Sequence, residues 1–172
     1  METPVPLEDH VFSIDINVPR RRVWDAILKT GAIQRFMMNT VLESTLEPGA
    51  RMLYYSPNRK YVFVVGEVLE VIPERKFSHT YMFTTQSEAP SIVTWEFEDI
   101  PAGCRVTLTH SGWTTQVKTH KDVGGGWRMI LDALKSELET GKIPLKMRLT
   151  YGLMGATAFM LPRSARAEGM EK

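Results

Sequence analysis

The sequence predicts an α+β fold in which a curled antiparallel sheet lies against one long helix. Six strand-like segments follow one another between residues 40 and 114, and short links containing Gly, Pro or Asn join most of them. No helical pattern separates these segments, which argues against a parallel, doubly wound sheet. An amphipathic segment over residues 122–140 comes next, and at about 1.5 Å per residue it is long enough to cross such a sheet.

The first strand and the helices after it open the predicted domain. Apolar and polar residues alternate over residues 12–18, as in a half-buried strand. Pro19 ends this strand and suits the first turn of a helix, whose apolar stripe runs from Val23 to Leu28 and stops near Gly31. The segment AIQRFMM, residues 32–38, predicts one or two further helical turns. Two short helices are therefore expected after the first strand.

The six later strands are predicted as a meander of antiparallel hairpins. Their residue ranges are 40–46, 51–55, 61–72, 76–85, 91–99 and 104–114. Within the fourth, Phe77, His79, Tyr81 and Phe83 fall on one face, because side chains two residues apart share a face of a strand. This aromatic face is expected to be the buried one.

The long helix is predicted over residues 122–140, with Asp122 as N-cap and Gly141 just after its end. Its buried stripe consists of Val123, Trp127, Ile130, Leu131, Leu134 and Leu138. The run from Gly124 to Gly126 is interpreted as a flexible first turn. It lacks the Lys-Ser/Thr pair that follows the glycines of a phosphate-binding loop.

Four motifs in order resemble the START-like SRPBCC superfamily, and within it the branch related to the C-terminal domain of the activator of heat-shock-protein-90 ATPase. They are NVPRRRVWDAI, GEVLEVIPERKFSHTY, IVTWEFEDIPAGCRVTLTHSGW and GWRMILDALKSELETG. The resemblance covers about residues 12–141. It implies a helix-grip (START-like) fold, a seven-stranded sheet around a long C-terminal helix. It also implies a central cavity, in which many members hold an apolar or amphipathic small molecule, while others are cyclases, hydrolases or lipid carriers.

The inner face of the predicted sheet carries two imidazoles and a phenol, His79, His110 and Tyr81, on an otherwise apolar surface. A buried polar group without a partner costs about 1–3 kcal/mol, so each needs one. Partners within the core are the favoured interpretation, and the polar spot of a ligand pocket is the alternative. Catalysis by these three residues is the weakest interpretation, since no carboxylate stands at a spacing that would orient an imidazole. The residues expected to contact a ligand are Phe36, Met37, Tyr54, His79, Tyr81, Phe83, Trp95, Phe97, His110, Trp127, Leu131 and Leu134, with Phe36 and Met37 as a lid.

The function predicted from these features is binding of a small hydrophobic or amphipathic ligand between the sheet and the long helix. One alternative is a polyketide-cyclase-like enzyme or hydrolase that uses the cavity His and Tyr residues. The other is a stress-related, co-chaperone-type protein-interaction module. With 21 basic and 20 acidic residues, no nucleic-acid partner is expected. No cofactor or metal is expected either, because Cys104 is the only cysteine and the four histidines are scattered.

The chain is divided into a domain over residues 10–142 and a C-terminal extension over 143–172. The extension is expected to hold a helix at 145–161 and a disordered end. The apolar run 149–161 is shorter than the roughly 20 residues that span a bilayer. Packing on its own domain or pairing in a homodimer is favoured for it over contact with a membrane surface. The first ten residues carry acids and prolines rather than the pattern of a signal peptide, so a cytoplasmic protein is expected.

Overall fold

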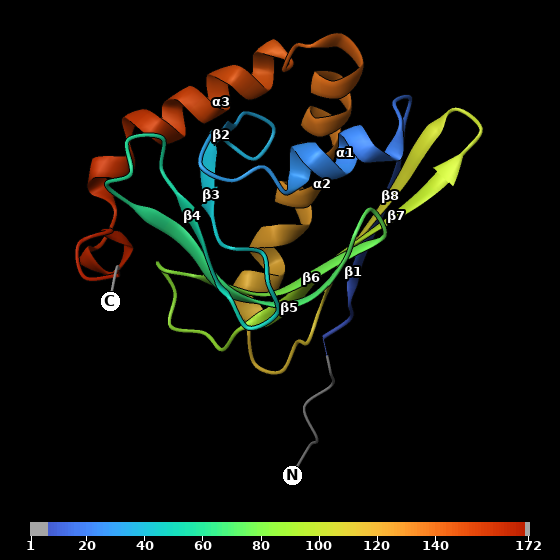
Figure 1. Ribbon diagram of the computed structural model, residues 1–172. Coiled ribbons are helices and arrows are strands. Elements are labelled where there is room, and N and C mark those ends of the chain that lie inside the picture. The colour runs from blue at the N-terminus through green and yellow to red at the C-terminus, as the bar shows by residue number, and fades with distance from the viewer. Residues whose placement is uncertain (1–6, 171–172) are drawn as a thin grey trace.

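The computed structural model describes residues 7–170 (Figure 1). Two parts of the chain lie outside this range. They are residues 1–6, within the segment that lacks the pattern of a signal peptide, and residues 171–172, within the end expected to be disordered. The strands are β1 His10–Ile16, β2 Ile33–Gln34, β3 Thr40–Glu43, β4 Arg51–Tyr55, β5 Val62–Ile72, β6 Lys76–Phe83, β7 Ser91–Ile100 and β8 Gly103–Ser111. The α-helices are α1 Arg20–Ile27, α2 Val117–Thr140 and α3 Leu145–Ala156, followed by two 3-10 turns, Ala158–Met160 and Arg163–Ala165.

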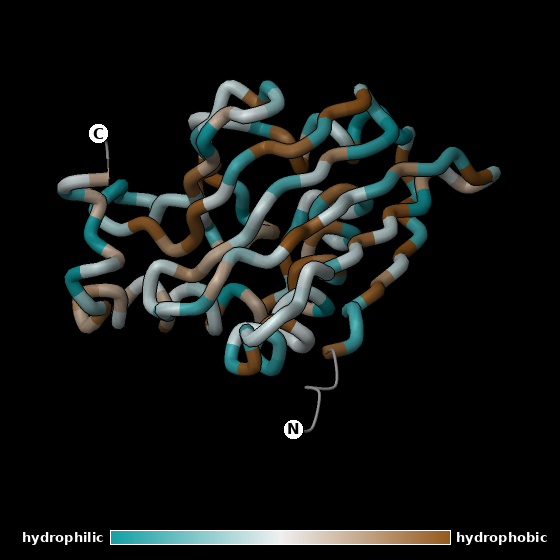
Figure 2. Tube along the Cα trace, turned by 90° about the horizontal axis from the view of Figure 1, so that it is seen from below, coloured by the Kyte–Doolittle hydropathy of each residue, from teal (hydrophilic) through white to brown (hydrophobic). Residues whose placement is uncertain are grey.

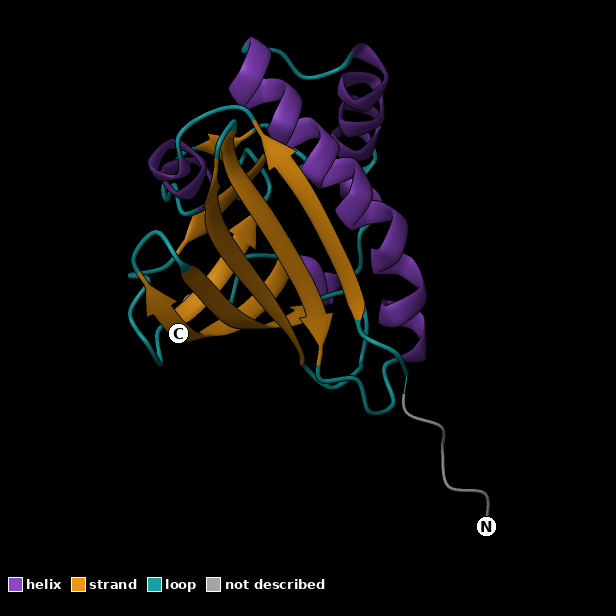
Figure 3. Cartoon of the chain, turned by 90° about the vertical axis from the view of Figure 1, so that its right-hand side faces the viewer, coloured by secondary structure: helices purple, strands orange, loops and turns teal. Residues whose placement is uncertain are grey.

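All eight strands form one antiparallel sheet in the order β1-β8-β7-β6-β5-β4-β3-β2. The sheet curves around the long helix α2, as Figure 3 shows. The predicted α+β helix-grip architecture is confirmed, and the expected count of seven strands is wrong by one. The additional strand is β2.

The main core lies between α2 and the inner face of the sheet. Hydrophobic and hydrophilic residues alternate along β1 where it leaves the N-terminal trace (Figure 2). The same alternation along β6 and β7 turns one side chain in two toward the helix. The side chains that are less than 2% exposed include Phe77, Trp95, Leu108, Leu131 and Leu134.

The second short helix, expected over residues 32–38, is not formed. The segment is instead β2 followed by a turn, in which Met38 and Asn39 have φ angles of 54° and 59°. Such angles cannot continue a right-handed helix. The buried Gln34 amide donates hydrogen bonds to the carbonyls of Ile27 and Lys29, each at 2.9 Å, and so satisfies the C-terminal end of α1. Phe36 and Met37 therefore lie in a turn rather than on a lid helix.

The long helix begins at Val117, not at Asp122. Its first amides are capped from a distant loop, because the Glu88 carboxylate accepts hydrogen bonds from the backbone N–H groups of Lys118 (3.0 Å) and Thr119 (2.8 Å). Residues Gly124–Gly126 consequently lie inside the helix, and their interpretation as a first turn is wrong. The expected stop at Gly141 is confirmed, with a left-handed φ of 73°.

Alanine substitutions at Gly125 and Gly141 are expected to act in opposite directions. A Cβ added at Gly125 meets nothing within 4 Å, so Gly125→Ala should raise the free energy of unfolding by about 1 kcal/mol through helix propensity. Gly141→Ala should lower it by about 1 kcal/mol, because an L side chain disfavours the left-handed conformation. Urea denaturation measures both. A destabilised Gly125→Ala would show that the helix needs flexibility at this position.

The C-terminal extension is ordered as far as the structure describes it. The helix expected over 145–161 ends at Ala156 and is followed by the 3-10 turn at 158–160. The sequence suggested that the last residues are disordered, and for residues 163–170 this is wrong. These residues pair with the chain near the start of β5. The Ala167 N–H donates to the carbonyl of Lys60 at 3.0 Å, and Tyr61 forms an antiparallel bridge with Arg166. The division of the chain at residue 142 stays a prediction.

Candidate functional site

A cavity of about 600 Å³ lies between the sheet, the long helix α2 and the C-terminal helix α3. Its walls come from the turn before β3, from β4, β5 and β6, and from both helices. The lining residues are Met37, Met38, Asn39, Thr40, Tyr54, Ser56, Pro57, Asn58, Phe63, Val64, Tyr81, Phe83, Thr85, Trp127, Ile130, Tyr151, Gly152, Met154, Gly155, Thr157, Ala158 and Leu161.

Most of the residues that line the cavity are apolar or aromatic, and a few carry neutral polar groups. Buried Val64, Trp127 and Ile130 supply apolar surface. The phenols of Tyr54 and Tyr81 are buried as well, and burial raises the pKa of both above the ordinary value, so they remain neutral hydroxyls. None of the lining residues is Asp, Glu, His, Lys or Arg. An apolar pocket with a few neutral polar groups is typical of sites for small molecules.

The helix α3 forms a wall that was not predicted from the sequence. Its inner side is anchored by Tyr151, which is 3% exposed and whose hydroxyl donates to the carbonyl of Phe36 at 3.3 Å. Burial raises the pKa of Tyr151 to about 12. The sequence signal for this contact was a single aromatic residue, Tyr151, on the side of the helix opposite Leu149 and Leu153.

The structure separates the twelve expected ligand contacts into two groups. Met37, Tyr54, Tyr81, Phe83 and Trp127 line the cavity. The other seven are buried in the core and do not line it, namely Phe36, His79, Trp95, Phe97, His110, Leu131 and Leu134. The open volume is thus displaced from the two histidines toward β4, β5 and α3. Ligand contact by any of the twelve stays a prediction.

His110 is held by a continuous chain of hydrogen bonds. The indole N–H of Trp127 donates to Nδ1 of His110 at 2.9 Å, which fixes the tautomer with the proton on Nε2. Nε2 in turn donates to the Ser91 hydroxyl at 2.6 Å, and this hydroxyl donates to the carbonyl of Tyr81 at 3.2 Å. Burial lowers the pKa of His110 to about 3. The imidazole is therefore a neutral structural link between β6, β7, β8 and α2.

His79 has a local role at an irregularity of the sheet. Its Nδ1–H donates to the carbonyl of Thr80 at 2.8 Å, while Nε2 is buried without a partner among the described residues. The β5–β6 register shifts between Val68 and Glu70, close to this point. Burial lowers the pKa of His79 to about 4, against the opposing effect of the hydrogen bond. A neutral imidazole is the form that fits here.

The geometry gives the three weak catalytic candidates no acid–base arrangement. Among residues 7–170, no carboxylate forms a hydrogen bond with His79 or His110, and both ring nitrogens of His110 are already engaged. Tyr81 does line the cavity, but burial holds its proton on the phenol. Their part in any catalysis stays a hypothesis from the sequence.

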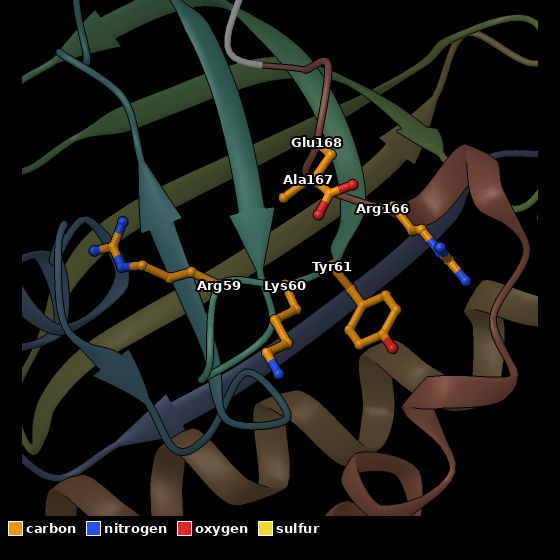
Figure 4. A pocket seen from close by; sticks show the side chains of 6 residues that line it. All are labelled: Arg59, Lys60, Tyr61, Arg166, Ala167 and Glu168. Carbon is orange, nitrogen blue, oxygen red and sulfur yellow. The ribbon is translucent and has the colours of Figure 1, made fainter.

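A second hollow of about 510 Å³ lies where the C-terminal residues meet the start of β5, lined by Arg59, Lys60, Tyr61, Arg166, Ala167 and Glu168. Figure 4 shows the side chains of Arg59, Lys60 and Arg166 pointing in different directions. Arg59 also pairs with the carboxylate of Glu43 at 2.5 Å. Because the cations do not converge, this hollow is not a built anion site, and the apolar cavity is the better candidate.

Comparisons with known proteins agree with this fold. The sequence profile of a family described as "Activator of Hsp90 ATPase homolog 1-like protein" matches residues 17–139. No curated protein sequence matches the chain.

Three solved structures similar to the chain are 16–21% identical to it in sequence, so they show the fold alone. Protein MLL2253 from Mesorhizobium loti has a TM-score of 0.65 at 21% identity, covering 79% of this chain and 100% of its own. CalU16 from Micromonospora echinospora has a TM-score of 0.62 at 19% identity, covering 88% and 86%. The Aha1 dimer from Colwellia psychrerythraea has a TM-score of 0.64 at 16% identity, covering 79% and 99%.

Proposed function

The chain belongs to the family of Activator of Hsp90 ATPase homolog 1-like proteins, and from this premise we propose that it binds a small, uncharged, hydrophobic or amphipathic molecule between the sheet, α2 and α3. The observation that carries the proposal is the cavity of about 600 Å³ with apolar walls. Small-molecule pockets in proteins typically measure about 300–1,000 Å³. The lining residues, rather than family membership, decide what such a cavity can bind.

The lining argues for a ligand without charge. Taking an unpaired ionic group out of water is very unfavourable, and no lining residue offers an opposite charge. The apolar body of the ligand would pack against aromatic surfaces such as Phe63, Phe83 and Trp127. A hydroxyl, carbonyl or amide would meet the phenols of Tyr54 and Tyr81. The same lining counts against the enzyme alternative, since it holds no group that titrates near neutral pH.

Filling the cavity from α3 is expected to weaken binding without unfolding the protein. A Cβ added at Gly155 meets nothing within 4 Å, so Gly155→Phe can place a ring in the open volume. Leu153→Phe is the matched control, because Leu153 is 67% exposed on the outer side of α3. We expect Gly155→Phe to weaken binding of the neutral fluorescent probe 1-aminoanthracene at least about tenfold, which corresponds to about 1.4 kcal/mol of binding free energy. Leu153→Phe should bind like the unmodified chain.

Native mass spectrometry and organic extraction of the purified protein complete the test, since they detect a molecule carried from the cell. Equal probe binding by Gly155→Phe and the unmodified chain would contradict the proposed site. Absence of any bound molecule together with no probe binding would contradict the proposed function.

A further inference from the structure

The outer side of α3 and the turn after it expose large apolar side chains. Leu145, Leu149 and Leu153 are 66%, 67% and 67% exposed, and Phe159 and Met160 are 71% and 73% exposed. Figure 1 shows α3, in orange-red, at the periphery of the molecule. The three leucines are four residues apart and so share one face of the helix, opposite the buried Tyr151. Within residues 7–170, no segment packs over this face.

The charged residues in the segment that carries this face have one sign. From residue 140 to residue 167 the chain has five basic residues and no acidic one. All five are exposed, and none forms an ion pair within the described residues: Lys142, Lys146, Arg148, Arg163 and Arg166. At about 100° per residue, Lys146 and Arg148 fall on the two flanks of the leucine stripe. Both can extend alongside the stripe and keep their charges at its edges.

We propose that α3 and the 3-10 turn at 158–160 dock on an anionic membrane surface. The exposed leucines, Phe159 and Met160 would enter the boundary between head groups and acyl chains, and the flanking basic residues would contact anionic head groups. The helix lies on the surface rather than crossing it. No helix in the described part of the chain is long and apolar enough to span a bilayer.

A membrane fits this face better than a second copy of the chain does. In a symmetric pair, each α3 would meet the same patch of its partner, and Lys146 and Arg148 would face cations instead of anions. The area is also small. A helix of 12 residues is about 18 Å long and about 10 Å wide. The area of such a footprint is well below the roughly 800 Å² that each partner of a stable interface buries.

Docking by α3 also places the cavity at the lipid surface. Tyr151, Gly155 and Ala158 line the cavity from the same segment that carries the exposed stripe. If the cavity binds an apolar molecule, as proposed above, that molecule could pass between membrane and protein without crossing water. This consequence rests on the proposed function, whereas the docking itself does not.

Co-sedimentation of the full chain with vesicles tests the proposal. We expect binding to vesicles of 70% phosphatidylcholine and 30% phosphatidylserine, and at least about tenfold weaker binding to pure phosphatidylcholine. Leu149→Glu with Leu153→Glu should weaken binding to the anionic vesicles at least about tenfold, and Lys146→Glu with Arg148→Glu should do the same. These positions are exposed, so circular dichroism and the melting temperature should stay unchanged.

Two control variants test whether the binding depends on this surface, rather than on any exposed apolar side chain or on the net charge. Val117→Glu removes an apolar side chain that is 64% exposed on α2, and Arg22→Glu with Lys121→Glu changes the net charge as much as the basic pair on α3 does. Both controls should bind like the unmodified chain. Equal losses in the controls, or no binding to anionic vesicles, would overturn the proposal. So would a dimer in sedimentation velocity that Leu149→Glu with Leu153→Glu dissociates, because the face would then belong to a second copy. Probe binding in the cavity is measured without vesicles, so the two proposals fail independently.

Discussion

Replacing Gly66 by alanine is expected to destabilise the protein by about 3 kcal/mol or more. A Cβ at this position would lie 2.1 Å from the carbonyl oxygen of Thr80 and 3.1 Å from its carbonyl carbon, both in the adjacent strand β6. Backbone atoms cannot yield as a flexible side chain can, so the two strands must separate. The same carbonyl accepts the Nδ1–H of His79 and would be moved away from it. Chemical denaturation at 25 °C measures the change.

Gly125→Ala is the matched control for this substitution, because it adds the same methyl group where nothing lies within 4 Å. A Gly66→Ala chain that remains unfolded would agree with the expectation, since the loss would then exceed the total stability of the domain. A free energy of unfolding within about 1 kcal/mol of the unmodified chain would contradict it. That outcome would mean that β5 and β6 can adjust around residue 66 at little cost.

Where the sequence predicted this structure well, the information was local. The period of two along residues 76–83 correctly assigned one face of β6 to the core, because only one face of this sheet packs against α2. The stripe from Val123 to Leu138 likewise identified the long helix. Both patterns can be read without knowing which distant residues come together.

The errors came from contacts between residues far apart in the chain. The helix α2 starts five residues before the expected N-cap because Glu88, from the loop before β7, caps its amides. The segment after α1 forms β2 and a turn because Gln34 caps α1 and because two non-glycine residues adopt positive φ angles. No local pattern marks either feature.

In the candidate site, too, the features set by local patterns were predicted and those set by contacts between distant residues were not. Tyr54, Tyr81, Phe83 and Trp127 were expected to line a cavity, because strand and helix periodicity gives the direction of each side chain. The hydrogen-bond partners of His110 come from β7 and α2, and the third wall of the cavity comes from α3. Since both depend on how separate elements pack, the sequence could suggest a polar spot but not its position relative to the open volume.

Acidification from pH 7 to pH 5 is expected to lower the free energy of unfolding by about 4 kcal/mol, about 2 kcal/mol for each of His79 and His110. Burial lowers the folded-state pKa of these residues to about 4 and about 3, below the ordinary histidine value of 6.5. Above pH 6.5 both states carry neutral imidazoles, and the stability is fully present. Below pH 6.5 the unfolded chain takes up protons that the folded chain does not, so stability falls until the pH reaches the folded-state pKa values. The carboxyl groups of Glu88 and Glu139, whose pKa values are lowered, add to this loss only at lower pH.

The variant His79→Gln isolates one of the two contributions. Its stability at pH 7 will change for reasons of packing, but the difference between pH 7 and pH 5 should shrink from about 4 to about 2 kcal/mol. Urea denaturation at the two pH values gives this difference, and NMR of the imidazole carbons follows each histidine directly in the folded chain. We expect the signals of His79 and His110 not to titrate between pH 7 and pH 5. A midpoint near 6.5 for either ring would show that it reaches water in the folded protein, which the burial of both side chains to 1% exposure or less argues against.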